Sequence, residues 1–341
     1  MRVEVVDRFG VRKDPKMSTL PLALNPEEVR RQFQERLQAW MGNQTSFSLR
    51  TIRVIRYKPG RRCLIEYDLD RMITSQQKER LTLIGKIKSR SFGKSGYRLL
   101  KSFWDTGFQT DKGDGISVPE PVGTIPAFRM WLQRKVPGKI STDLLAKSGA
   151  ESLVQRIAEA AYKLQEAGVS THREHSISDE IRILHEHLPK VTKQNRRWTE
   201  RIDRLLEAAD RLGRAIPTPC RTGIHRDFYA DQVIVDDARL TLIDFDLYCL
   251  GDPGLDIGNF IAHITEQSLR LLGDPKALKD QEQAMEERYV ELRGKWVRPS
   301  VKTYTTLTLL RHIYLSTLFP ERRTLTAPLL ELCEERLKVT R

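Results

Sequence analysis

Short apolar runs, in which β-branched residues alternate with polar ones, dominate the first 140 residues. A period of two over such runs is typical of half-buried strands. The sequence predicts strands at TIRVIRYK (51–58), CLIEYDL (63–69), LTLIGKIK (81–88) and FRMWLQRKV (128–136). Pro59-Gly60 is a strong turn signal and predicts a β-hairpin over 51–69, while Pro137-Gly138 ends the last run.

Two helices accompany these strands. PEEVRRQFQERLQAWMG (26–42) has apolar positions at helical spacing, with Pro26 at its start and Gly42 after its end. A second helix is predicted around 95–105. The stretch 106–126 is rich in glycine and proline and is expected to be mostly loop.

Beyond residue 140 the pattern becomes helical. Helices are predicted over 150–168, over 178–212 with a break near Pro189, and at several places within 254–341. Two short apolar runs, 233–235 and 240–245, are separated by Asp236-Asp237 and predict a second hairpin. The expected architecture is α+β: a β-rich unit over 1–138, with an extra N-terminal helix at 26–42, and a larger, mainly helical unit over 139–341.

Positive charge is concentrated in the first unit. The chain has 341 residues and a formal net charge of +13. Residues 1–140 hold 28 Lys/Arg against 14 Asp/Glu, and the remainder is nearly balanced. This asymmetry favours an anionic partner such as a nucleotide, a nucleic acid or an anionic membrane surface, although a solubilising surface explains it equally well.

Composition excludes several classes of protein. No apolar run is long enough to span a membrane, and the N-terminus lacks the apolar core of a secretory signal. The four cysteines are scattered, without the spacing of a zinc site or a disulfide framework. A reducing, cytoplasmic location is therefore expected. His172, His175, His185 and His187 have loose metal-ligand spacing, but without further ligands they are interpreted as ordinary surface histidines.

Acidic residues gather in the segment 222–260, on loops beside the second hairpin. They are Asp227, Asp244 with Asp246, and Asp252 with Asp256. Carboxylates that leave neighbouring strands can converge on a hard cation, and Mg²⁺ prefers one or two carboxylates together with substrate phosphates. A phosphoryl-transfer site also needs a carboxylate that orients the attacking hydroxyl.

The order of motifs in this segment resembles the aminoglycoside phosphotransferase/choline kinase family, which has the protein-kinase-like fold. The motifs are His225-Arg226-Asp227, Gln232, Ile243-Asp244-Phe245-Asp246 and Gly251-Asp252-Pro253 followed by Asp256. The resemblance spans about 50–265. It implies a two-lobed enzyme that uses ATP and Mg²⁺ to phosphorylate a hydroxyl of a small molecule.

The resemblance also implies roles for individual residues. Asp227 would be the catalytic aspartate, and Asp244 would bind Mg²⁺ together with Gln232. His225 and Asp256 would support the catalytic loop. Asp246 is either a second metal ligand or a helix cap, and Arg226 either binds phosphate or faces solvent.

Residues of the first unit would bind the nucleotide. Lys86, in the third strand, would contact the α- and β-phosphates, unless it is an ordinary exposed lysine. The turn Gly60-Arg61-Arg62 would cover the phosphates, unless it is only structural. Gln133, Arg134 and Val136 would form the hinge that meets the adenine.

Two departures from the family pattern leave a second function open. Gln232 stands where the family has an asparagine, and the helix 95–105 has no glutamate to pair with Lys86. A nucleotide-binding pseudokinase that acts as a regulatory or scaffold module is therefore the alternative. Binding of nucleic acid or anionic surfaces as the main role is not favoured, because no nucleic-acid motif is present. The balanced charge of residues 141–341 gives no support for a polycationic aminoglycoside acceptor.

Overall fold

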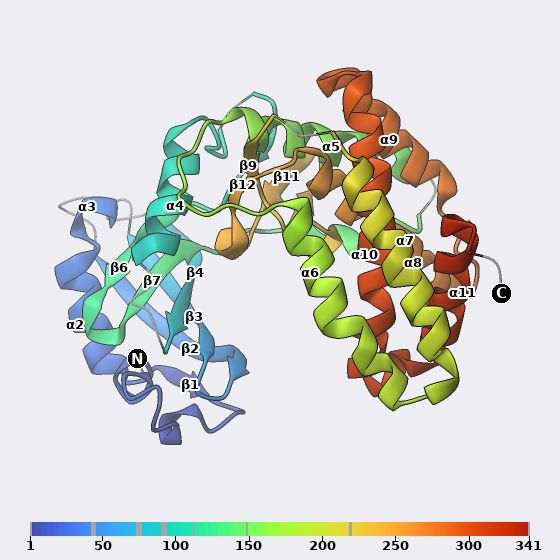
Figure 1. Cartoon of the computed structure of the whole chain (residues 1–341). Helices are drawn as coiled ribbons and strands as arrows, with labels where there is room; N and C mark the ends of the chain where they lie inside the picture. Colours follow the sequence, from blue (N-terminus) through green and yellow to red (C-terminus); the bar gives the residue numbers. More distant parts are fainter. Residues whose placement is uncertain are drawn as a thin grey trace. The chain divides into compact units, whose positions relative to one another are not determined.

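The computed structural model describes residues 2–41, 46–72, 77–89, 94–111, 113–147, 149–217 and 220–339. The chain divides into two compact units, Met1–Pro137 and Gly138–Arg341 (Figure 1). Within the described ranges, every helix is either too short or too polar to cross a lipid bilayer.

The first unit is built on a six-stranded sheet with the order β1-β2-β3-β4-β7-β6. Its strands are β1 (Glu4–Val6), β2 (Phe47–Lys58), β3 (Arg62–Met72), β4 (Lys78–Lys88), β6 (Pro121–Ile125) and β7 (Met130–Arg134). β1 is parallel to β2, and the other neighbours are antiparallel. All four predicted strands are confirmed. β7 is shorter than expected because residues 126–128 form a turn of 3₁₀ helix.

Helices from the N-terminal segment belong to the core of this unit. They are α1 (Leu20–Ala23), α2 (Pro26–Arg36) and α3 (Gln38–Met41), while α4 (Lys94–Asp105) follows β4. The predicted helix 26–42 is thus interrupted at Leu37. Phe33 of α2 packs edge-on against Tyr67 of β3, with ring centroids 5.1 Å apart. The Tyr67 hydroxyl donates a hydrogen bond to the Ala23 carbonyl at 3.0 Å, so this segment closes one face of the sheet.

The second unit is mainly helical, as the periodicity predicted. Its helices are α5 (Ala150–Glu166), α6 (Ile177–His187), α7 (Thr199–Ala215), α8 (Gly254–Leu272), α9 (Lys279–Arg293), α10 (Arg298–Leu318) and α11 (Thr326–Leu337). Its strands are β8 (Lys139–Ile140), β9 (Thr222–Ile224), β10 (Val233–Asp236), β11 (Arg239–Leu242) and β12 (Cys249–Gly251). The predicted β10–β11 hairpin is confirmed. The antiparallel β9–β12 pair was not predicted, because three-residue strands carry too little periodicity.

Short elements connect these helices and strands. They are β5 (Ile116–Ser117), η1 (Val11–Lys13), η2 (Pro126–Phe128), η3 (Ser141–Asp143), η4 (Leu188–Lys193), η5 (Arg196–Trp198), η6 (Ala230–Gln232), η7 (Phe245–Leu247), η8 (Lys295–Val297) and η9 (Pro320–Leu325), where η denotes a 3₁₀ helix.

α8 lies at the centre of the helical unit and packs along α10 (Figure 1). Glycines allow this close approach. A Cβ on Gly258 would lie 2.7 Å from the Val301 carbonyl oxygen, and a Cβ on Gly254 would lie 2.5 Å from the Ser300 hydroxyl. Because almost every residue of α8 is buried, its polar side chains must find partners inside the unit.

Candidate catalytic site

The loop that carries Asp227 connects β9 to β10 and is held by a buried carboxylate. Asp256, in the first turn of α8, accepts hydrogen bonds from the backbone N–H groups of His225 at 2.9 Å and Arg226 at 2.7 Å. Arg226 has φ of 69°, a left-handed conformation that a non-glycine residue adopts only when its surroundings enforce it. The two bonds to Asp256 supply that constraint immediately before Asp227.

A second side chain of α8 holds the same loop from its other end. The Asn259 side-chain amide donates a hydrogen bond to the Phe228 carbonyl at 2.8 Å. Asn259 is three residues after Asp256, so both side chains project from the same face of the helix. The residue types and their spacing could have indicated this role, but the sequence analysis identified only Asp256.

Sequence reasoning missed a buried ionic network behind Asn259. The Arg311 guanidinium of α10 donates to the Asn259 side-chain oxygen at 2.6 Å and to the Glu180 carboxylate of α6 at 3.3 Å. The His175 ring lies 2.7 Å from the same carboxylate. Burial alone would raise the pKa of Glu180, but His175 and Arg311 hold it below 4.5. The interpretation of His175 as a surface histidine is therefore wrong, since its ring is buried against Glu180.

Asp244 and Gln232, the predicted metal ligands, lie on segments that hydrogen-bond to each other. The Ile243 N–H donates to the Gln232 carbonyl at 3.0 Å, and the His225 Nε2 lies 2.9 Å from the Ile243 carbonyl. Asp244 itself has φ of 63°, a second left-handed non-glycine residue in this region. A non-glycine residue in this conformation costs about 1–3 kcal/mol of conformational free energy, and such residues are typical of functional sites.

The Asp227 carboxyl lies close enough to Asp244 for the two charges to interact. Burial raises the pKa of the Asp227 carboxyl, and the negative charge of Asp244 raises it further. His225, Arg311 and Arg226 act in the opposite direction. A carboxyl with a raised pKa is a stronger proton acceptor, which suits a general base.

The donor set of these loops fits a divalent cation. Asp244 offers carboxylate oxygens, and the side-chain amide of Gln232 carries a carbonyl oxygen that is a potential ligand. No set of three or more His, Cys, Asp or Glu ligands occurs in the described ranges. One carboxylate and one amide oxygen match the way Mg²⁺ is held when phosphates supply the other ligands.

In the first unit, the predicted phosphate-binding turn is tied to the N-terminal segment. Gly60 has φ of 63°, and its N–H donates to the Asp14 carboxylate at 2.7 Å. The Tyr57 hydroxyl bonds the same oxygen at 2.7 Å. Sequence reasoning did not identify Asp14, because forty-odd residues separate it from the turn.

The same turn carries concentrated positive charge. The neighbouring charge of Arg62 lowers the pKa of Lys58, and Arg56 and Arg61 add to this effect. Mutual repulsion of this kind is relieved when an anion binds. The concentration of positive charge is therefore electrostatically suited to phosphate.

Lys86 of β4 has an aromatic neighbour where the family pattern has a glutamate. Its ammonium group lies 4.8 Å from the centroid of the Trp131 ring. The same ring packs against Gly96 of α4, where an added Cβ would lie 3.4 Å from the indole nitrogen. Trp131 thus links Lys86 to α4 through a cation–π contact, which can orient the ammonium group without a carboxylate.

The predicted hinge residues end β7. Gln133 is buried, and the Arg134 side chain forms ion pairs with Glu79 at 2.5 Å and with Glu120 at 3.7 Å. Val136 is half-buried and follows the strand. The Arg134 guanidinium is thus committed to ion pairs within the first unit.

Comparison with known proteins identifies the architecture. A family model described as phosphotransferase enzyme family matches residues 109–291, which is more than half of the chain. A search of curated proteins gives no match.

Several solved structures are similar at low sequence identity. A mutant of aminoglycoside phosphotransferase APH(4)-Ia, in complex with AMP-PNP and hygromycin B, gives a TM-score of 0.56 at 16% identity, covering 91% of this chain and 97% of that one. A choline/ethanolamine kinase family protein from Mesorhizobium loti gives 0.52 at 14% identity, covering 80% and 85%. Amicoumacin kinase, in complex with AMP-PNP, Ca²⁺ and its ligand, gives 0.54 at 15% identity, covering 83% and 88%. The α+β fold of these proteins is the fold predicted from the sequence.

Proposed function

The chain belongs to the phosphotransferase enzyme family, and on that premise we propose that it is an ATP- and Mg²⁺-dependent small-molecule kinase. It would transfer the γ-phosphoryl group of ATP to a hydroxyl of its acceptor. The observation that carries the proposal is that Asp227 and Asp244 lie near each other, on loops that hydrogen-bond to each other. Binding of AMP-PNP by the similar structures supports a nucleotide as the donor.

The residues of this chain would act mainly by positioning and by charge. The acceptor hydroxyl attacks the γ-phosphorus, the bond to the β,γ-bridging oxygen breaks, and Asp227 accepts the hydroxyl proton. Mg²⁺, held by Asp244 and Gln232, would offset the charge on the phosphates. Lys86 and the Gly60-Arg61-Arg62 turn would bind phosphate oxygens, and backbone groups of Gln133 through Val136 would contact the adenine.

The charges around Asp227 bear on the class of acceptor. Arg226, Arg311 and Asp244 all act electrostatically on the Asp227 carboxyl. A polycation would be repelled by Arg226 and would compete with the metal for Asp244. We therefore propose a neutral or anionic hydroxyl compound, in contrast to the aminoglycoside hygromycin B bound by the similar structure.

Two experiments test this function. Thermal unfolding in the presence of ATP, with and without Mg²⁺, measures nucleotide and metal binding, and a screen of hydroxyl compounds with labelled ATP measures phosphoryl transfer. The kinase should show metal-dependent stabilisation that Asp244→Ala removes, and slow ATP hydrolysis that Asp227→Ala abolishes. Asp203→Ala, which removes an exposed carboxylate of α7 away from these loops, is the control and should leave both unchanged. Nucleotide binding that ignores the metal, with no turnover of any acceptor, would contradict the proposal and favour the pseudokinase alternative.

A further inference from the structure

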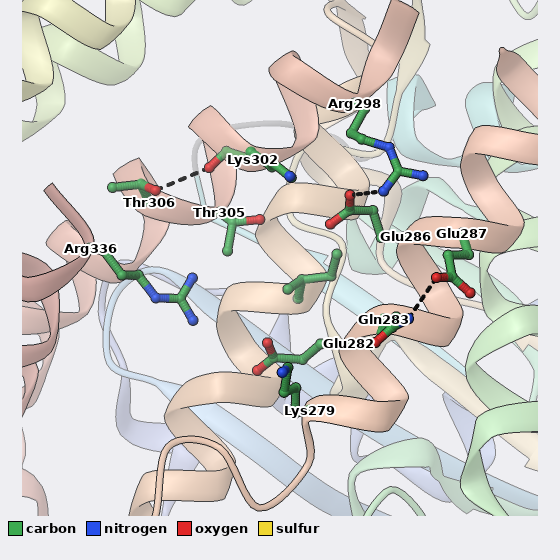
Figure 2. Close-up of a pocket in the computed structure, with 11 residues that line it drawn as sticks. Lys279, Glu282, Gln283, Glu286, Glu287, Arg298, Lys302, Thr305, Thr306 and Arg336 are labelled. Carbon is green, nitrogen blue, oxygen red and sulfur yellow. Dashed lines mark hydrogen bonds and ion pairs between the residues drawn. The ribbon is translucent and has the colours of Figure 1, made fainter. Parts of the chain in front are cut away.

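A second site is available among four helices of the second unit. A cavity of about 560 Å³ opens there (Figure 2). Its lining comes from α8, α9, α10 and α11: Ile261, Lys279, Glu282, Gln283, Glu286, Glu287, Arg298, Lys302, Thr305, Thr306 and Arg336. The volume lies within the range typical of small-molecule sites.

This cavity lies on the far side of α8 from the loop that carries Asp227. Asn259 bonds the Phe228 carbonyl of that loop, and the His263 ring stacks on Tyr229 with centroids 4.6 Å apart. Ile261 lies between these two residues in sequence and lines the cavity. Because helix residues two positions apart point to nearly opposite sides, α8 separates the cavity from the candidate catalytic site.

Three cations of the lining form no ion pair in the described part of the chain, although Lys279 and Arg336 lie near Glu282. Arg298 is paired with Glu286 at 2.7 Å, and the Gln283 amide donates to Glu287 at 2.7 Å. Lys279, Lys302 and Arg336, by contrast, form no ion pair with any residue in the described part of the chain. Figure 2 shows the Arg336 guanidinium directed into the cavity opposite Glu282. Unpaired cations around a concave surface attract a compact anion.

Glu282, the carboxyl group nearest these cations, is only partly ionised at neutral pH. The Thr265 hydroxyl donates to Glu282 at 2.5 Å, and burial raises the pKa of Glu282 to about 7. Lys279 and Arg336 lower the pKa and Glu286 raises it, so groups from α9 and α11 all face this carboxyl. Lys302 of α10 completes the charged wall. The cavity therefore becomes more positive as the pH falls through 7.

We propose that this cavity binds a small organic anion whose carboxylate or phosphate group is held by Lys302 and Arg336. The Thr305 and Thr306 hydroxyls donate to carbonyls of their own helix, so their oxygens are left to accept hydrogen bonds from ligand hydroxyls. Ile261 provides an apolar contact for a short carbon skeleton. Because α8 lines this cavity and also holds the loop that carries Asp227 through Asp256 and Asn259, the anion is suited to act as an effector.

The test uses sulfate and malonate as probes, with chloride at equal ionic strength as the reference. Binding to the full chain is measured by calorimetry and by thermal unfolding at pH 6. The double variant Lys302→Gln/Arg336→Gln should lose at least about tenfold in affinity for both anions. The control variant Lys193→Gln/Arg323→Gln removes the same number of positive charges at exposed positions outside the cavity. It should bind both anions as the wild type does.

A pH series gives a second, independent readout, because sulfate does not titrate between pH 6 and pH 8. Wild-type affinity should fall several-fold over this range as Glu282 becomes charged, whereas Glu282→Gln should bind at pH 8 as the wild type binds at pH 6. Stabilisation that chloride reproduces, or affinity that Lys302→Gln/Arg336→Gln leaves unchanged, would overturn the proposal. The second outcome would place the anion elsewhere, such as at the basic turn near Gly60.

Discussion

Replacing Asp256 by asparagine tests how α8 holds the loop that carries Asp227. The side chain is fully buried and accepts the N–H groups of His225 and Arg226, one on each oxygen. Two accepted bonds of this kind favour the ionised carboxylate. Asparagine keeps the shape but turns an NH₂ group toward one of the two N–H donors, which leaves that donor unsatisfied.

The expected loss of stability follows from these bonds. An unsatisfied buried donor costs about 1–3 kcal/mol, and the remaining bond loses its charge assistance, which is worth about 1 kcal/mol. Burial raises the pKa of Asp256, which shows that the buried charge is itself costly. Removing this buried charge in Asp256→Asn recovers part of the lost stability. We therefore expect the free energy of unfolding to fall by about 2 kcal/mol, or the folding constant to fall roughly 25-fold.

Urea unfolding at neutral pH measures this change, with Asp203→Asn on the exposed face of α7 as the control. Hydrogen exchange over residues 222–230 should also become faster in Asp256→Asn, since the left-handed Arg226 would lose its constraint. Unchanged stability together with unchanged exchange would refute the reasoning. It would mean that the carboxyl is protonated in the native state, or that the two N–H groups find other acceptors.

Three further changes follow from the structure. Arg311→Met removes a positive charge that compensates the buried Glu180 carboxylate, and it should lower the free energy of unfolding in urea by about 2–3 kcal/mol. Arg311→Lys should restore part of this stability, and a loss below about 0.5 kcal/mol in Arg311→Met would contradict the network. Glu282→Gln should equal the wild type near pH 4.5 and exceed it above pH 7. The pKa of Glu282 is about 7 in the folded protein against an ordinary 4.5, so the wild type loses stability as the pH rises through this window. The loss is ~3 kcal/mol at most, and it is smaller where water screens the half-buried group. A parallel pH profile for the two proteins would disprove this. Gly258→Ala should lower stability by about 1–3 kcal/mol because its Cβ would lie 2.7 Å from the Val301 carbonyl, and a neutral effect in thermal unfolding would show that α8 and α10 can separate.

Local pattern was sufficient to predict most elements of this protein. The four strands of the first unit, the β10–β11 hairpin and the helices after residue 140 follow from hydrophobic period and turn residues, which act over a few neighbouring positions. The spaced acidic motifs were also enough to predict the family and the fold. The roles of Asp227 and Asp244 are predictions that the proposed substitutions test, and those of Gln232 and Lys86 also remain predictions.

Contacts between residues far apart in sequence could be decided only by the tertiary structure. The tie from Asp14 to the turn at Gly60, and the network in which Arg311 meets Glu180, join segments that share no local pattern. A short strand such as β9, and a cavity whose walls come from four helices, likewise have no signature in a single stretch of residues. The physical reason is that a hydrogen bond or an ion pair depends on distance in space, whereas periodicity reports only which face of an element is buried.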